Sequence, residues 1–389
     1  MKFTATFIAT IATAGLSVFA QNTSPDGDVS LKLEIERAIT KGAKFLESQQ
    51  DKENGYWSEE TLPAFTSLAL AAIMGDPNAD VANKPEFVQK GYTYLVGQQK
   101  NDGGIYGKGL ATYNTSLAIM ALIQSGEKEH LPVIAKARRL LVNQQQDHDK
   151  RGETDNMFDG GIGYGGSYAH SDLSNTHLAA QALYYSKKVL ADTEHAVEFD
   201  LDWDAAIDFI SLCQNSEKSV DRLGDQYALR EEDKGGFVYF PTSTKSDEIE
   251  LETNGEKRVA LRSYGSMSYA GLLAFLYAEM DMEDPRLQAA LKWLQGNYTL
   301  EENPGMDQQG LFYYYHTMAK ALALGKIKTL KTPEGKTIQW RQELALKILE
   351  NQKPDGSWIN EGSNRWMEDN PVLVSSYSMI ALQHIYHSL

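Results

Sequence analysis

A block of residues that returns several times along the chain constrains its fold most. The clearest copies occupy residues 41–50 and 90–99, and each contains a lysine-glycine pair, an aromatic residue followed by leucine, and two glutamines. A glycine turn with an aromatic residue follows each copy. Such a block predicts an amphipathic helix that ends at a glycine turn, with a glutamine hydrogen-bonded to the backbone of the turn. More divergent copies are centred on Leu140-Leu141, Phe209-Ile210, Trp293-Leu294 and Ile348-Leu349, and Tyr298 replaces the glutamine in the fifth copy.

A second helix of different composition follows each block. These segments are rich in alanine, leucine and tyrosine and poor in charge, as expected for helices that are buried on most sides. They span residues 65–75, 113–125, 174–186, 266–277, 314–325 and 373–384. The first and last units are as apolar as the others, whereas an open stack of repeats needs polar end units. We therefore expect an all-α, α/α toroid of six helical hairpins, with an inner barrel of helices sheathed by outer helices.

One column of small hydroxyl residues runs through the aligned inner helices. The fifth helix has Tyr315 at this position, with Thr317 nearby. A hydroxyl shared near the start of several helices indicates capping or close packing rather than chemistry. The column contains Thr66, Thr115, Thr176, Ser268 and Ser375.

The N-terminus and the composition restrict location and partners. Residues 1–20 have the basic start, short apolar core and small residues of a secretory signal peptide, so we expect a single mature domain over 21–389 that is periplasmic or secreted. No second apolar run predicts stable membrane insertion. The single cysteine, Cys213, excludes an internal disulfide framework and a thiolate-rich zinc site. A net charge of −16 argues against nucleic acid as a partner. We expect no cofactor and no metal, and the sequence does not specify the oligomeric state.

The repeated block resembles the QW repeat of squalene and oxidosqualene cyclases. Related repeats build the β-subunits of protein prenyltransferases, and the resemblance implies the α/α-toroid domain that both groups share. It covers essentially the whole predicted mature chain. The sequence is also similar to exported bacterial proteins with prenyltransferase and squalene-oxidase repeats.

Two family motifs are incomplete in this chain. Squalene-hopene cyclases protonate the isoprenoid through the middle carboxyl of an Asp-x-Asp-Asp-Thr motif, and the resembling segment here, residues 172–176, has Ser174 at that place. Prenyltransferases bind zinc through Asp, Cys and His, but Cys213 lies in an outer-helix block. His170, Asp172 and His177 do not follow a recognised metal-ligand spacing. The resemblance therefore predicts the fold more specifically than the reaction.

The starts of the inner helices are the predicted site, because parallel helices gather their positive ends at one mouth. The long connections 146–168 and 215–264 belong to the same end. The candidates for catalysis are Asp172, Asn175, Tyr264, Tyr315 and His316. The candidates for substrate binding are Arg262, Tyr269, Tyr314, Trp366, Glu368 and Asn370.

Several candidates also have a purely structural interpretation. Asp172 is a suitable helix N-cap, and Arg262 is a suitable partner for the acidic residues of segment 247–252. In the run 313–315 we expect one tyrosine ring to face the interior while the others pack. His316 is as easily a satisfied buried residue as a participant in chemistry.

Three functions fit these residues. The favoured hypothesis is a terpenoid-cyclase-like protein, cyclase or prenyltransferase in type, that binds an isoprenoid or similar apolar ligand among aromatic rings, with burial raising the pKa of Asp172 or Glu368. The second is a polysaccharide lyase, in which Arg262 and Asn175 neutralise a uronate carboxylate while Tyr315 or His316 moves protons. The third is a non-catalytic module that binds a lipid or glycan.

Overall fold

The computed structural model describes residues 25–166, 170–196, 199–253 and 255–389. The predicted signal peptide lies outside the described residues. Each of the six charge-poor segments forms an inner helix that begins within a few residues of its predicted start. These helices are α3 (Pro63–Met74), α5 (Ala111–Ser125), α7 (Leu173–Leu190), α10 (Gly265–Tyr277), α12 (Leu311–Leu324) and α14 (Pro371–Ser388).

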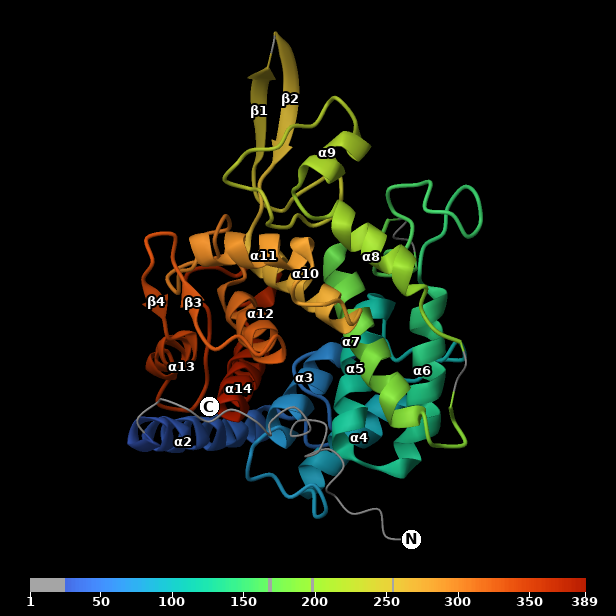
Figure 1. Ribbon diagram of the computed structural model, residues 1–389. Coiled ribbons are helices and arrows are strands. Elements are labelled where there is room, and N and C mark those ends of the chain that lie inside the picture. Colours follow the sequence, from blue (N-terminus) through green and yellow to red (C-terminus); the bar gives the residue numbers. More distant parts are fainter. Residues whose placement is uncertain (1–24, 167–169, 197–198, 254) are drawn as a thin grey trace.

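The inner helices close into a ring (Figure 1). Each packs against the next inner helix in chain order, and α14 packs against α3. The outer helices cover the outside of this ring, and the first of them packs on the last. The prediction of an α/α toroid is therefore confirmed. The outer helices are α2 (Pro25–Gln49), α4 (Glu86–Gly97), α6 (Leu131–Asn143), α8 (Trp203–Leu212), α11 (Pro285–Gly296) and α13 (Trp340–Glu350).

Short elements occupy the connections. The antiparallel hairpin of β1 (Glu248–Thr253) and β2 (Glu256–Leu261) projects away from the ring beside α9 (Glu217–Leu223), as the upper part of Figure 1 shows. Among the described residues, no helix has both the length and the apolar character needed to cross a membrane. The remaining elements are η1 (Lys128–His130), β3 (Leu330–Lys331), β4 (Thr337–Ile338) and η2 (Arg365–Met367).

A recurring glutamine joins each outer helix to the next. The Nε2 of Gln50 donates to the carbonyl of Gly55 in its own turn at 2.9 Å and to the carbonyl of Phe87 in α4 at 2.7 Å. The corresponding amide of Gln352 donates to Gly356 at 3.0 Å and to Ala38 of α2 at 2.9 Å, which links the last hairpin to the first. We call this pair of bonds the glutamine clamp. It is formed by Gln50, Gln99, Gln145, Gln214 and Gln352.

The exceptional fifth hairpin keeps the link between outer helices with a different group. There the hydroxyl of Tyr298 lies 3.3 Å from the carboxylate of Glu343 in the first turn of α13. A phenol reaches farther than an amide and needs only one acceptor. Tyr298 therefore replaces the predicted glutamine without opening the ring.

The glycine turns pack directly on the neighbouring outer helix. Gly55 has a φ of +84°, and a Cβ there would lie 2.7 Å from the carbonyl oxygen of Lys90 in α4. The Trp57 indole donates to the carbonyl of Leu46 at 2.6 Å. A Cβ on Gly91 would lie 2.8 Å from the Trp57 ring, so this ring lies under the next outer helix, as the sequence predicts.

The column of hydroxyl residues ties each turn to its inner helix. Each side-chain oxygen accepts a hydrogen bond of 2.9–3.0 Å from the backbone N–H of the residue just after a glycine turn. In the fifth inner helix, Thr317 donates instead to the carbonyl of Tyr313. The column is structural, although its donors come from the turns and not from helix ends. The pairs are Thr66 with Trp57, Thr115 with Ile105, Thr176 with Ile162, Ser268 with Phe237, and Ser375 with Trp358.

The clamp is testable with two adjacent glutamines. Replacing Gln50 with Leu leaves the carbonyls of Gly55 and Phe87 without their donor, so we expect the free energy of unfolding to fall by about 1–3 kcal/mol. Gln49 is exposed and donates only to the Ser48 hydroxyl, so Gln49→Leu should change it by less than about 0.5 kcal/mol. Urea denaturation of both variants measures the difference. Equal effects would contradict a role for the clamp.

Candidate functional site

Contacts across the ring identify the side chains that face its interior. Tyr313 of α12 lies with its hydroxyl 3.4 Å from Nε2 of His177 in α7, although α10 separates these helices in the ring. The Tyr313 ring lies 5.7 Å from that of Tyr377 in α14, and the Tyr377 hydroxyl lies 3.4 Å from the hydroxyl of Tyr113 in α5. Four inner helices therefore meet through these rings. We call Tyr113, His177, Tyr313 and Tyr377 the aromatic layer.

The interior faces of α7 and α12 follow helical spacing. The Ser174 side chain lies near the Tyr313 hydroxyl one turn before the His177 contact, and one turn after it Gln181 accepts a hydrogen bond from Lys320, with 2.8 Å between Oε1 and Nζ. Residues three or four apart share one face of a helix, so these contacts place one stripe of each helix inward. His316 belongs to the α12 stripe, with its ring 5.2 Å from that of Tyr377.

Asp172 lies buried at the mouth of this interior. It caps α7 by accepting a hydrogen bond from the backbone N–H of Asn175 at 2.8 Å, and the Asn175 side-chain amide donates to its other oxygen at 2.8 Å. Burial raises the pKa of Asp172 to about 6, against the lowering effect of these bonds. Burial also raises the pKa of the Tyr239, Tyr264 and Tyr313 hydroxyls, and the charge of Asp172 adds to each shift. One carboxyl thus lies among several tyrosines.

Glu368 is a second buried carboxyl, and it caps a helix to which it does not belong. It accepts hydrogen bonds from the backbone N–H groups of Tyr313 at 2.8 Å and Phe312 at 3.3 Å, and from the Asn360 side chain at 2.7 Å. Its surroundings exclude water, and burial raises its pKa to about 7 despite these donors. Glu368 therefore stabilises the start of α12.

Other inner helices also have their first N–H groups bound by side chains. Asn370 accepts from Val372 and Leu373 at the start of α14. Asn303 accepts from the N–H of Ser266 in α10, and Asn114 accepts from that of Ala64 in α3. Many backbone N–H groups at the starts of the inner helices are therefore already hydrogen-bonded to side chains of the protein.

The tyrosine run divides between interior and packing. Tyr313 reaches across the ring, whereas the Tyr314 hydroxyl donates to the carbonyl of Thr299 at 3.0 Å and the Tyr315 hydroxyl donates to that of Leu300. The Tyr269 ring packs 5.7 Å from that of Tyr314. Sequence reasoning selected Tyr314 and Tyr315 and missed Tyr313. The spacing of 313, 316 and 320 on one helix face was the signal for it.

Two candidates lie toward the surface. The Arg262 side chain is 43% exposed and pairs with Asp247 at 3.0 Å near the β1–β2 hairpin. Trp366 is also 43% exposed, with the Arg365 guanidinium 4.5 Å above its ring. Among the described residues, no hydrogen bond or ion pair joins Arg262 to Asn175, Tyr315 or His316. The contacts therefore do not bring together Arg262 and Asn175, the pair that a lyase would need to neutralise a uronate carboxylate.

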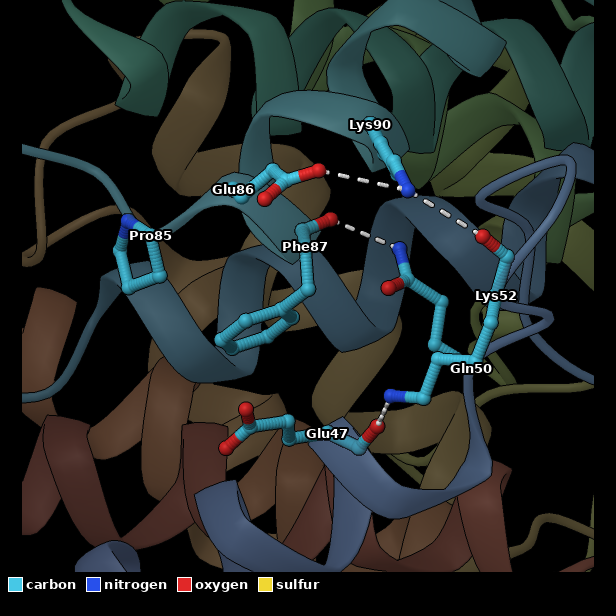
Figure 2. A pocket seen from close by; sticks show the side chains of 7 residues that line it. All are labelled: Glu47, Gln50, Lys52, Pro85, Glu86, Phe87 and Lys90. Atoms are coloured by element: carbon cyan, nitrogen blue, oxygen red, sulfur yellow. Dashed lines mark hydrogen bonds and ion pairs between the residues drawn. The ribbon is translucent and has the colours of Figure 1, made fainter.

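The grooves on the outer surface follow from the repeated architecture. One of about 330 Å³ lies where α2 ends beside the start of α4, and Figure 2 shows Gln50 there with its amide bound to Phe87. Another contains Gln99, the clamp residue of the next hairpin. Grooves at equivalent junctions are a consequence of the clamp, so they do not indicate a specific site.

Metal-ligating side chains do not gather in the described part of the chain. Among these residues, no three His, Cys, Asp or Glu side chains lie together as a metal site would require. Cys213 is fully buried at the end of α8, and burial raises the pKa of its thiol. The His170 ring packs 4.8 Å from that of Phe240.

Comparison with solved structures supports the same architecture. No family model matches the sequence. A variant of type II terpene cyclase MstE from Scytonema, in complex with geranylgeranyl dihydroxybenzoate (substrate), superposes with a TM-score of 0.55 and 13% identity over 93% of this chain and 100% of that one. The apo form gives 0.53 and 12% identity over 92% and 99%. The chain has the toroid fold of type II terpene cyclases. These superpositions confirm the predicted α/α-toroid fold.

Glu368 should make stability depend on pH. Its pKa is raised from 4.5 to about 7 in the folded protein, so the folded state retains a proton that the unfolded state has lost between these values. Its contribution is fully present below pH 4.5 and is lost as pH rises through 7, a change on the order of 3 kcal/mol. Glu368→Gln should lack this part of the decline in urea denaturation measured from pH 4 to 8.

Asp369 supplies the matched control, because it is the exposed neighbour of Glu368. Asp369→Asn should keep the wild-type pH profile. Glu368→Ala, which removes the acceptor altogether, should be less stable than Glu368→Gln by about 1–3 kcal/mol. A Glu368→Gln profile parallel to that of the wild type would exclude this carboxyl as the titrating group.

Proposed function

We propose that the ring interior binds an isoprenoid or a similar apolar ligand and that Asp172 donates a proton to it, as in a terpene cyclase. The observation that carries this proposal is the buried Asp172 carboxyl, with its pKa raised to about 6, beside the tyrosines at the mouth of the ring. We further propose that residues 1–20 direct the protein out of the cytosol as a signal peptide.

The aromatic layer suits a carbocation. Faces of aromatic rings attract cations, and the attraction grows where water is excluded. Tyr113, Tyr313 and Tyr377 come from three helices and meet in the interior. Tyr113 and Tyr313 each retain some accessible surface although protein surrounds them, as side chains that line an internal space do.

The proton transfer uses groups of this chain alone. The Asp172 carboxyl gives its proton to a carbon of the alkene, which leaves a carbocation that an internal double bond attacks to form the ring. The last cation loses a proton to a neutral base. His177 is suitably neutral, because burial and the nearby Lys320 charge lower its pKa to about 3. Ser174 is too weak an acid for the first step.

Among the three functions, the terpene cyclase is better supported than the polysaccharide lyase and the binding module. The substrate named for the Scytonema cyclase carries a geranylgeranyl chain, and the superposition with that enzyme covers 93% of the present chain. The lyase is less well supported, because Arg262 pairs with Asp247 away from Asn175. A binding module without chemistry would retain the ligand and yield no product.

Replacement of Asp172 with Ser tests the proton donor. Serine is also a good helix N-cap, so Asp172→Ser should lose less than about 1 kcal/mol of stability while it removes the carboxyl. We expect cyclised products from geranylgeranyl and squalene-type substrates to fall at least about 100-fold, the scale of general acid catalysis. Mass spectrometry of extracted products and equilibrium binding of the same substrates provide the measurements, and binding should persist.

Asp202→Ser is the matched control. Asp202 caps the outer helix α8 by accepting from the N–H of Ala205 at 3.0 Å, so the same change is made at an equivalent cap outside the interior. This variant should form wild-type amounts of product. Full turnover by Asp172→Ser would remove Asp172 from the mechanism, and binding without product in the wild type would leave only the binding function.

A further inference from the structure

A lysine lies in the ring interior below the aromatic layer. Lys320 is on the inward stripe of α12, about two turns beyond Tyr313, and its Nζ donates to Oε1 of Gln181 across the interior at 2.8 Å. The other lysines on the described inner helices, Lys187 and Lys188, are exposed in the last turn of α7, so an inward lysine is unusual there. The terpene-cyclase chemistry proposed above uses its charge only to help keep His177 neutral and gives it no contact with the ligand.

The ammonium group of Lys320 has no acidic partner among the described contacts. Its Nζ donates a hydrogen bond to a neutral amide, and no ion pair joins it to a carboxylate of the described residues. Burial lowers its pKa to about 7, and no acid opposes this shift. A buried charge without a counter-ion is costly, and an anion that enters with a ligand would remove that cost.

The neighbours of Lys320 are hydrogen-bonding groups without negative charge. His177 and His316 come from α7 and α12, and His384 comes from α14. Burial lowers the pKa of all three rings, and the charge of Lys320 lowers it further. His316 is 6% exposed, and its Nδ1 has no hydrogen-bond partner among the described residues. Lys320 itself uses one of its three donors on Gln181. Lys320 and His316 therefore keep hydrogen-bonding capacity that no described contact uses.

We propose that Lys320, with Gln181 and His316, binds the carboxylate of an amphipathic acid whose isoprenoid chain extends toward Asp172. This inference rests on the proposed function, since it places the chain in the ring interior. The α7 backbone advances about 13 Å from Asp172 to Gln181, at 1.5 Å per residue. The two ends of such a ligand would therefore meet an acid at the mouth and a cation at depth.

A carboxylate fits this position better than a diphosphate. One ammonium with neutral imidazole and amide groups balances a single negative charge, whereas a diphosphate carries more charge and is usually held by several cations or a metal. Lys320 is the cation that the described contacts place at this depth. The ligand class is thus an isoprenoid acid.

Three probes separate the carboxylate from the chain. Geranylgeranoic acid and geranylgeraniol share the isoprenoid chain and differ at its end, while palmitate keeps the carboxylate on a saturated chain. We expect the wild-type protein to bind the isoprenoid acid at least 10-fold more tightly than the alcohol in isothermal titration calorimetry. Lys320→Met should lose this preference and still bind the alcohol. Lys136→Met, at an exposed position on α6, should behave as wild type.

Folding of the variant is a separate readout. Methionine has a similar length without the charge, so Lys320→Met should be at least as stable as the wild type in the absence of ligand. Equal binding of acid and alcohol by the wild type, or an acid preference that survives in Lys320→Met, would overturn the carboxylate site. Lys320-dependent binding of palmitate without binding of either isoprenoid would support the carboxylate site and contradict the isoprenoid function. Failure of all three probes to bind would contradict both.

Discussion

The structure depends on a side-chain amide that bonds two backbone segments at once. In the glutamine clamp, one NH₂ group binds the glycine turn of its own hairpin and a carbonyl of the neighbouring outer helix, as Gln50 does for Gly55 and Phe87. Both acceptors are fully or partly buried backbone carbonyls, and removing a donor from such groups costs stability. The clamp of Gln352 on Ala38 applies the same bond between the two ends of the chain. Closure of the ring is therefore built from the same local contact as the other glutamine-clamped steps, and only the fifth hairpin uses Tyr298 instead.

Closure also determines the character of the interior. Six parallel inner helices bring their starts to one end, where the buried acceptors Asp172, Asn303 and Glu368 and the half-buried Asn370 bind the first N–H groups. Deeper in the ring, Tyr113, Tyr313 and Tyr377 meet, and Lys320 lies beyond them. The interior thus changes from acidic at the mouth through aromatic to basic. This order is what a ligand with an alkene at one end and an anion at the other would require.

Local patterns made much of the fold predictable. The glutamine, the glycine turn and the hydroxyl column lie close together in each copy, so the sequence indicated both the hairpins and their bonding. The site was harder to predict, because its contacts join distant residues. Glu368 binds the backbone N–H of Tyr313 from 55 residues away, and Lys320 meets Gln181 from 139. Which ring of the run 313–315 faces inward depends on the phase of α12 against α7 and α14, and composition does not reveal that phase.

The central claim is that an isoprenoid chain occupies the ring interior. Crystals of the protein soaked with a farnesyl analogue that carries a bromine atom would locate the ligand by anomalous scattering. The account predicts a bromine peak enclosed by α5, α7, α12 and α14, between Asp172 and Lys320. A peak confined to the outer surface, for example in the groove beside Gln50 and Phe87, would contradict it.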